Sequence, residues 1–195
     1  ADLKVGYVCK VSGGTLTAML TTRQNSIEYK GRKYRIGQLG SYVIVPMDEG
    51  ERLVGFVTGV GREDVVVTDI KPQNMLDVQL LGSIMGERFT RGVRRYPTIG
   101  DEIRLAVQDD FQAIFGTMAE GAGEGGQPVK AFNLGRFAMN PDFEVHVLGK
   151  EFFSKHAAIL GNSGSGKSCT TAKVLCESLK LPESQIVLFD LHGEY

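Results

Sequence analysis

The residues with the clearest chemical potential form a glycine-rich stretch at 161–168, which reads GNSGSGKS. It matches the pattern G-x-x-x-x-G-K-[ST] at every fixed position. In that pattern the glycines let backbone N–H groups turn inward around phosphates, the lysine reaches the β- and γ-phosphates, and the last hydroxyl binds Mg²⁺. We therefore predict a nucleotide site, with Mg²⁺ at Ser168, made of Gly161, Asn162, Ser163, Gly164, Ser165, Gly166, Lys167, Ser168 and Cys169.

The elements around this stretch predict the opening of a parallel α/β domain. An apolar run at 157–160 precedes it, a helix is expected over 167–180, and a buried strand is expected at 186–189. The dipole of the helix would point at the bound anion. We expect the thiol of Cys169 to pack at the junction of loop and helix. Apolar spacings of three and four predict one buried helical stripe, formed by Ala172, Leu175, Cys176 and Leu179.

One acidic residue, Asp190, directly follows the predicted strand 186–189. It lies 23 residues after Lys167, an interval that holds one helix and nothing more. We interpret it as an acidic residue near the ligand crevice, where the carboxyl ends of the strands lie. Direct coordination of Mg²⁺ is the less favoured alternative.

Residues 4–115 have a different pattern, that of short strands separated by turns. Two β-rich runs flank Gly13-Gly14, which predicts a hairpin. Nine short β-rich runs in about 110 residues predict a small barrel or sandwich. The glycine-rich stretch 116–128 is interpreted as a flexible loop or linker. The expected strands are 5–11, 15–20, 27–29, 33–36, 42–45, 53–60, 65–70, 76–81 and 101–107, with a further one at 145–148.

The composition excludes several classes of protein. Hydrophobic residues at 42% and charged residues at 23% exclude a disordered, collagen-like or coiled-coil chain. The net charge of −1 gives no global basic field that would indicate nucleic acid. The sequence contains no run of about 18 apolar residues, so it predicts no membrane-spanning helix. Three cysteines without a CxxC pair favour a reducing compartment, so we expect a cytoplasmic protein.

Two segments beside the loop resemble HerA-type ATPases of the HerA/FtsK superfamily. They are His156–Leu160, which runs into the loop, and Asp190-Leu191-His192-Gly193-Glu194-Tyr195, which follows the predicted strand. The strand-rich region resembles the HAS barrel that precedes the motor domain of this family, and 133–145 is similar to the usual connection. The resemblance implies an N-terminal β-barrel domain over 1–140. It also implies that 141–195 form the first part of a RecA-like P-loop α/β domain.

The same resemblance implies an ATP-dependent translocase or helicase on double-stranded DNA. Such a protein would work as a hexameric ring, together with a nuclease or an anti-phage defence effector. Lys167 and Ser168 would serve the phosphates of ATP and Mg²⁺, while Asp190, His192 and Glu194 would lie beside the nucleotide. Lys167, Asp190 and Glu194 are then the catalytic candidates. A loop held by side-chain hydrogen bonds is the alternative explanation of His192 and Glu194.

Hydrolysis of ATP needs further groups, which position water and stabilise the transition state. The acid pair on a later strand, the arginine finger and the DNA-contacting pore loops of the family do not occur up to Tyr195. We expect them from residues outside this sequence, so the segment alone should be inactive. Two alternatives stay open: a P-loop ATPase that acts on protein or small molecules, and a barrel that serves chiefly as an assembly and docking module.

Two locally basic clusters, Lys30–Arg35 and Arg88–Arg95, could contact DNA. Because the whole chain is close to neutral, we predict that they are solvated turns and charges at subunit interfaces instead.

Overall fold

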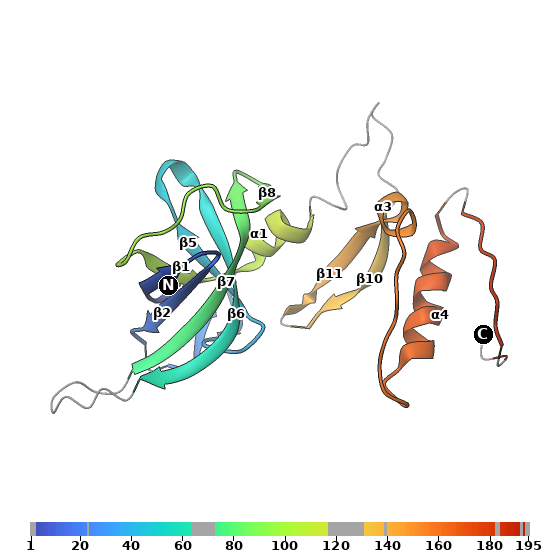
Figure 1. Cartoon of the computed structure of the whole chain (residues 1–195), viewed down its shortest axis with the longest axis horizontal. Helices are drawn as coiled ribbons and strands as arrows, with labels where there is room; N and C mark the ends of the chain where they lie inside the picture. Colours follow the sequence, from blue (N-terminus) through green and yellow to red (C-terminus); the bar gives the residue numbers. More distant parts are fainter. Residues whose placement is uncertain are drawn as a thin grey trace. The chain divides into compact units, whose positions relative to one another are not determined.

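The computed structural model describes residues 3–22, 24–63, 73–116, 131–138, 140–181, 184–191 and 193. The chain divides into two compact units, Ala1–Ile114 and Phe115–Tyr195, and each is described by itself (Figure 1). The domain boundary expected at residue 140 stays a prediction.

The first unit is a closed antiparallel barrel of six strands, in the order β2-β1-β9-β5-β6-β7. Pairing of β2 with β7 closes it, so each of the six strands has two ladder neighbours. The predicted barrel is therefore confirmed. Its strands are β1 (Lys4–Ser12), β2 (Thr15–Leu20), β5 (Tyr42–Pro46), β6 (Arg52–Glu63), β7 (Gln73–Met85) and β9 (Glu102–Leu105).

Three smaller elements surround the barrel. Strands β3 (Ser26–Tyr29) and β4 (Arg32–Arg35) form a separate hairpin. Strand β8 (Arg88–Arg91) extends the sheet beside β7, and a short 3₁₀ turn, η1 (Asp48–Gly50), joins β5 to β6. The sequence did not predict β8, because its arginine-rich composition lacks the apolar alternation of a barrel strand.

The barrel closes because apolar side chains alternate along its strands and turn inward. The predicted hairpin of β1 and β2 is confirmed, with Gly13 at a φ of +57° in the turn between them. The register of β6 and β7 shifts at Gly55 and again at Gly59, and such bulges increase the twist that a closed sheet requires. The core includes Val5, Leu16, Val43, Leu53, Val57, Leu76, Val78 and Ile103, none more than 2% exposed.

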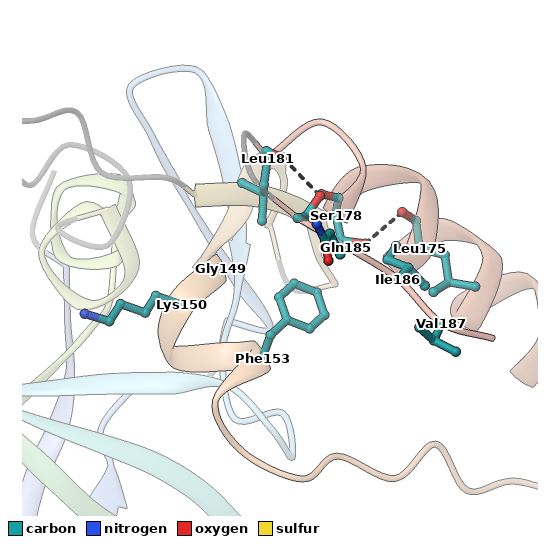
Figure 2. A pocket seen from close by; sticks show the side chains of 10 residues that line it. Gly149, Lys150, Phe153, Leu175, Ser178, Leu181, Gln185, Ile186 and Val187 are labelled. Carbon is teal, nitrogen blue, oxygen red and sulfur yellow. Dashed lines mark hydrogen bonds between the residues drawn. The ribbon is translucent and has the colours of Figure 1, made fainter. Parts of the chain in front are cut away.

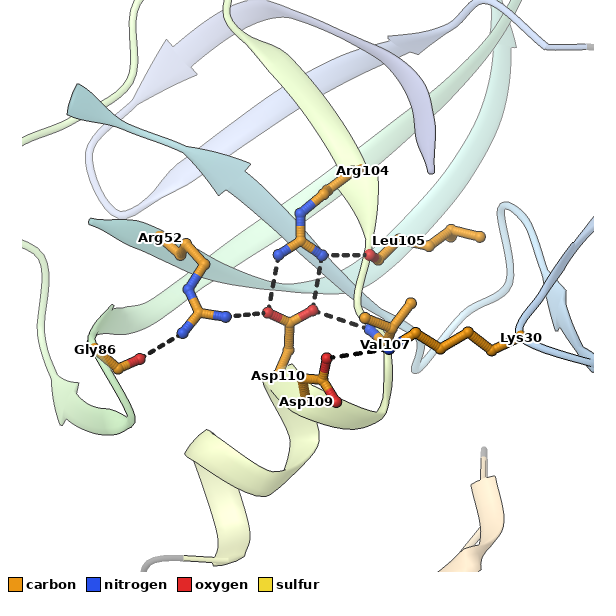
Figure 3. Close-up of polar contacts among 8 residues, drawn as sticks. All are labelled: Lys30, Arg52, Gly86, Arg104, Leu105, Val107, Asp109 and Asp110. Atoms are coloured by element: carbon orange, nitrogen blue, oxygen red, sulfur yellow. Dashed lines mark hydrogen bonds and ion pairs between the residues drawn. The ribbon is translucent and has the colours of Figure 1, made fainter. Parts of the chain in front are cut away.

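A fully buried carboxylate, Asp110, holds the chain against the barrel where it leaves β9 (Figure 3). It lies in α1 (Gln108–Phe111), which η2 (Gln112–Gly116) continues. Its two oxygens accept hydrogen bonds from Arg52 Nη1 at 2.8 Å, from Arg104 Nη1 and Nη2 at 2.7 and 2.9 Å, and from the Val107 N–H at 3.0 Å. Every member of this network has a partner, which a buried charge requires.

The second unit contains a hairpin, a short helix and a longer helix. The hairpin pairs β10 (Ala131–Phe137) with β11 (Asn140–Leu148), in a region that the sequence suggested as a connection with one strand at 145–148. Helix α3 (Gly149–Phe153) follows β11, and α4 (Lys167–Ser178) confirms the predicted helix. Aromatic contacts hold the hairpin to α3, since the Phe132 ring lies 5.4 Å from Phe152 and 5.5 Å from Phe153 between centroids.

The two strands predicted beside the glycine-rich loop are not formed, which corrects the sequence-based prediction. Residues 157–160 and 186–189 have no strand assignment, and Leu160 is 89% exposed and Phe189 91% exposed. The predicted stripe on α4 is also not buried, because Ala172, Cys176 and Leu179 are exposed. A strand needs a neighbour for its backbone groups and a layer over its side chains, and the described residues offer neither.

Two predicted features lie outside the described residues: the strand at 65–70 and most of the linker at 116–128. None of the helices in the described ranges is long and apolar enough to cross a membrane.

Candidate functional site

The glycine-rich loop leads into α4 through a turn that depends on glycine. Gly164 has a φ of +77° and Gly166, the N-cap of α4, has a φ of +89°. Residues with a Cβ rarely adopt this left-handed region, so glycine is required at both positions. At Gly161 the constraint is space, because a Cβ there would lie 2.4 Å from the Ser165 hydroxyl oxygen. The glycine pattern thus produces a tight loop at the start of a helix.

The loop folds around one carbonyl, that of Asn162. The Ser165 N–H donates to this oxygen at 3.1 Å and the Lys167 ammonium donates to it at 2.9 Å. The half-buried Lys167 side chain therefore turns back over the loop rather than extending into solvent. This contact holds the cation next to the loop backbone.

Helix α4 begins with donors that face the loop. The first helical bond runs from the Thr170 N–H to the Gly166 carbonyl at 2.9 Å, and the Thr170 hydroxyl donates to the same oxygen at 3.0 Å. The N–H groups of the first turn of a helix have no intrahelical acceptor, and the helix dipole adds partial positive charge there. A glycine loop, a lysine and a helix N-terminus in this arrangement can bind a phosphate anion.

The remaining predicted residues near the loop occupy different environments. Ser168 is half-buried in the first turn of α4, whereas Cys169 is exposed. The expected packing role of the Cys169 thiol is therefore wrong, because no described residue covers that face of α4. The half-buried Asp190 accepts a hydrogen bond from the Gly193 N–H at 2.9 Å, which closes a turn after the extended segment. His192 and Glu194 lie outside the described residues.

A groove of about 660 Å³ lies at the other end of α4 and was not predicted (Figure 2). Phe153 of α3, Leu175 of α4, and Ile186 and Val187 of the extended segment line it. Helical rise places Leu175 about 12 Å along the axis from Lys167, so the groove is separate from the glycine-rich loop. Its lining is largely apolar, which does not suit a triphosphate.

Sequence reasoning found the loop but missed the contacts that shape it. The bond from Lys167 to the Asn162 carbonyl uses backbone, so the type of residue 162 gives no signal for it. Thr170 and Thr171 donate to carbonyls four residues earlier, at 3.0 Å each, which is a local pattern of helical threonines that sequence could have indicated.

Comparison with known proteins adds independent information. Residues 132–195 match the family model described as helicase HerA, central domain. A probable DNA double-strand break repair helicase HerA from Methanocaldococcus jannaschii is 28% identical over 190 residues, 97% of this chain and 32% of the relative. The DNA double-strand break repair helicase HerA of Sulfurisphaera tokodaii is 27% identical over 175 residues, 80% of this chain and 31% of the relative.

A further relative, a probable helicase of M. jannaschii, is 40% identical over 62 residues, 32% of this chain and 12% of that protein. The chain thus spans about a third or less of the length of these curated relatives. The HerA matches extend over nearly the whole chain, the family model covers the glycine-rich loop, and the barrel precedes that loop as the resemblance implied. These comparisons support the resemblance to HerA-type ATPases of the HerA/FtsK superfamily.

Proposed function

We propose that residues 161–168 bind the phosphates of ATP as the nucleotide site of a DNA-translocating motor. The observation that carries this proposal is the Lys167 ammonium, held 2.9 Å from a loop carbonyl at the start of α4. An exchange of this neutral carbonyl for phosphate oxygens would give the lysine a charged partner. The loop N–H groups and the helix dipole would supply the remaining electrostatic stabilisation.

Magnesium fits the same site through the hydroxyl of Ser168. Mg²⁺ keeps several of its waters and takes few protein ligands when it also binds phosphate oxygens. Within the described part of the chain, no three His, Cys, Asp or Glu side chains could together hold a metal ion. Among the described residues, the Ser168 hydroxyl in the first turn of α4 is therefore the ligand that we propose for Mg²⁺. Asp190 and Glu194 remain candidates for orienting water or metal.

For the whole protein we propose an ATP-dependent translocase or helicase on double-stranded DNA that acts as a hexameric ring. Three relatives carry the name DNA double-strand break repair helicase HerA, which supports DNA as the substrate. A ring forms when one head-to-tail contact repeats by rotation, and a neighbour's arginine can then complete each nucleotide site. A nuclease or a defence effector would be the functional partner in the cytoplasm.

The second candidate function is that of an assembly and docking module. The barrel favours it, because six strands close on themselves around a core of their own. Such a unit can hold subunits together or seat a partner independently of nucleotide chemistry. Both functions can belong to one protein.

The decisive experiment is Lys167→Ala in the full-length protein. Loss of ATP hydrolysis and weaker binding of a fluorescent ATP analogue are expected, with the barrel still folded by circular dichroism. Lys180→Ala is the matched control, since it removes one ammonium near the other end of α4, where Lys173 still pairs with Glu177 at 2.7 Å. Unchanged hydrolysis in Lys167→Ala would contradict the assignment of the site.

A further inference from the structure

The two basic clusters of the barrel unit differ in how their cations are used. In the first cluster, Arg32 Nη1 donates to the Gln108 side-chain oxygen at 3.0 Å. Lys30 Nζ lies 3.7 Å from a carboxylate oxygen of Asp109 (Figure 3). Both contacts join the hairpin of β3 and β4 to the start of α1, so Lys30 and Arg32 already have a structural role, whereas Lys33 and Arg35 of the same cluster are exposed.

In the second cluster, three guanidinium groups have no side-chain partner among the described residues. Arg88, Arg91 and Arg94 are exposed, and within the described residues none has an ion pair or a side-chain hydrogen bond. Segment 87–95 contains four arginines against one glutamate, which leaves a net charge of +3 in a chain whose total is −1. This segment is therefore one of two local excesses of positive charge on the barrel unit, the other being Lys30–Arg35.

The segment that carries these arginines is fixed on the barrel. Ladder pairing sets Phe89 opposite Ile84 of β7, a fully buried residue. After β8, Val93 packs against the core, and Arg95 donates through Nε and Nη2 to the buried Glu51 carboxylate at 3.2 and 2.9 Å. The backbone that presents the exposed arginines is thus held at both ends, which lowers the entropy lost on binding a ligand.

We propose that Arg88, Arg91 and Arg94 form a contact surface for the phosphate backbone of double-stranded DNA. This proposal rests on the proposed function, in which DNA is the substrate. The cluster uses arginine only, and the planar guanidinium fork matches two phosphate oxygens at once. An acidic protein surface could also pair with these groups, but a regular row of phosphates suits several unpaired cations on one short segment better. The contacts bind phosphate and therefore do not read sequence.

The test measures binding of the 195-residue chain to a fluorescein-labelled 20-bp DNA duplex by anisotropy, over a series of salt concentrations. Arg88→Ala, Arg91→Ala and Arg94→Ala combined should weaken binding about tenfold or more at low salt. The slope of log affinity against log salt should also fall by roughly 0.9 for each arginine that contacts phosphate. The corresponding triple lysine variant should keep the slope, because it keeps the charges.

The matched control removes three positive charges elsewhere on the barrel unit. Lys10, Lys33 and Arg35 are exposed, and their combined alanine variant should lower affinity much less than the arginine variant. Equal losses in the two variants, or no DNA binding by the parent chain, would overturn the proposal. A changed oligomeric mass by light scattering with unchanged DNA affinity would overturn it too, in favour of a subunit interface. Binding of the ATP analogue is measured in parallel, so failure here leaves the nucleotide-site proposal intact.

Discussion

Leucine and valine side chains are buried in the barrel and exposed around the glycine-rich loop. Leu53 and Val57 are fully buried in the barrel, whereas Leu160 is 89% exposed and Val187 is 79% exposed. The residue types are the same, so the difference comes from pairing. Every barrel strand has at least two neighbours within the first unit, while the apolar runs 157–160 and 186–189 have no strand partner among the described residues.

This contrast separates two ways of building a functional region. A closed barrel needs contacts between distant strands, such as β2 with β7, and is complete once they form. The glycine-rich loop needs only short-range bonds, from Ser165 and Lys167 to Asn162 and from Thr170 to Gly166. The shape of this glycine-rich loop therefore depends on bonds between residues close together in the sequence. A complete motor core is a separate, non-local requirement.

The largest expected effect concerns the two regions expressed separately. Residues 1–140 should show a cooperative thermal transition by circular dichroism, because the barrel holds its own core. Residues 141–195 should show none, because their apolar side chains lack a covering layer. The comparison between the regions would fail if the isolated 141–195 peptide unfolded cooperatively.

The same contrast explains what the sequence could predict. Two β-rich runs around Gly13-Gly14 identified β1 and β2, since a hairpin is specified by residues close together in the sequence. The pattern of residues 161–168 identified the loop for the same reason. Burial at Leu179 and at 186–189 was predicted wrongly, because apolar spacing says which face could be covered but not whether a partner is present.

Buried charge was the other feature that sequence reasoning did not find. Asp110 is one of two adjacent aspartates, and nothing in the sequence separates it from the exposed Asp109. Only the closed barrel brings Arg52 of β6 and Arg104 of β9 to the same carboxylate. Such networks depend on tertiary contacts between residues as far apart as 52 and 110, which local patterns do not encode.

A matched pair of substitutions sharpens the comparison at single residues. Leu53→Ala should lower the free energy of unfolding of the barrel by about 2–5 kcal/mol, because it leaves a cavity in a closed core. Leu179→Ala, in the second unit, should change the unfolding free energy of the 195-residue chain by less than about 0.5 kcal/mol, because that side chain is 64% exposed. Urea titration followed by fluorescence or circular dichroism measures both. Similar losses in the two variants would show that α4 is buried after all.

The smallest expected effect is a pH dependence of folding stability, which arises from Asp110 in the barrel unit. Burial by itself would raise the pKa of Asp110, but hydrogen bonds from Arg104 and Val107 and the charges of Arg104 and Arg52 outweigh it, so the pKa lies below its ordinary value. A carboxylate whose pKa is lowered by folding stabilises the protein fully above its unfolded pKa of about 3.9. That contribution disappears as the pH falls through the folded pKa.

Asp110→Asn removes the charge at nearly constant shape and isolates this contribution. At pH 7 the variant should lose about 1.5–3 kcal/mol of unfolding free energy, the range for hydrogen bonds to charged groups. The gap between parent and variant should stay constant from pH 7 to pH 5 and narrow below about pH 4, because the parent then loses the same charge. Asp109→Asn, at an exposed position, is the control and should shift stability by less than about 0.5 kcal/mol at any of these pH values. A gap that stays as wide at pH 3 as at pH 7 would mean that Asp110 holds the start of α1 by shape rather than by charge.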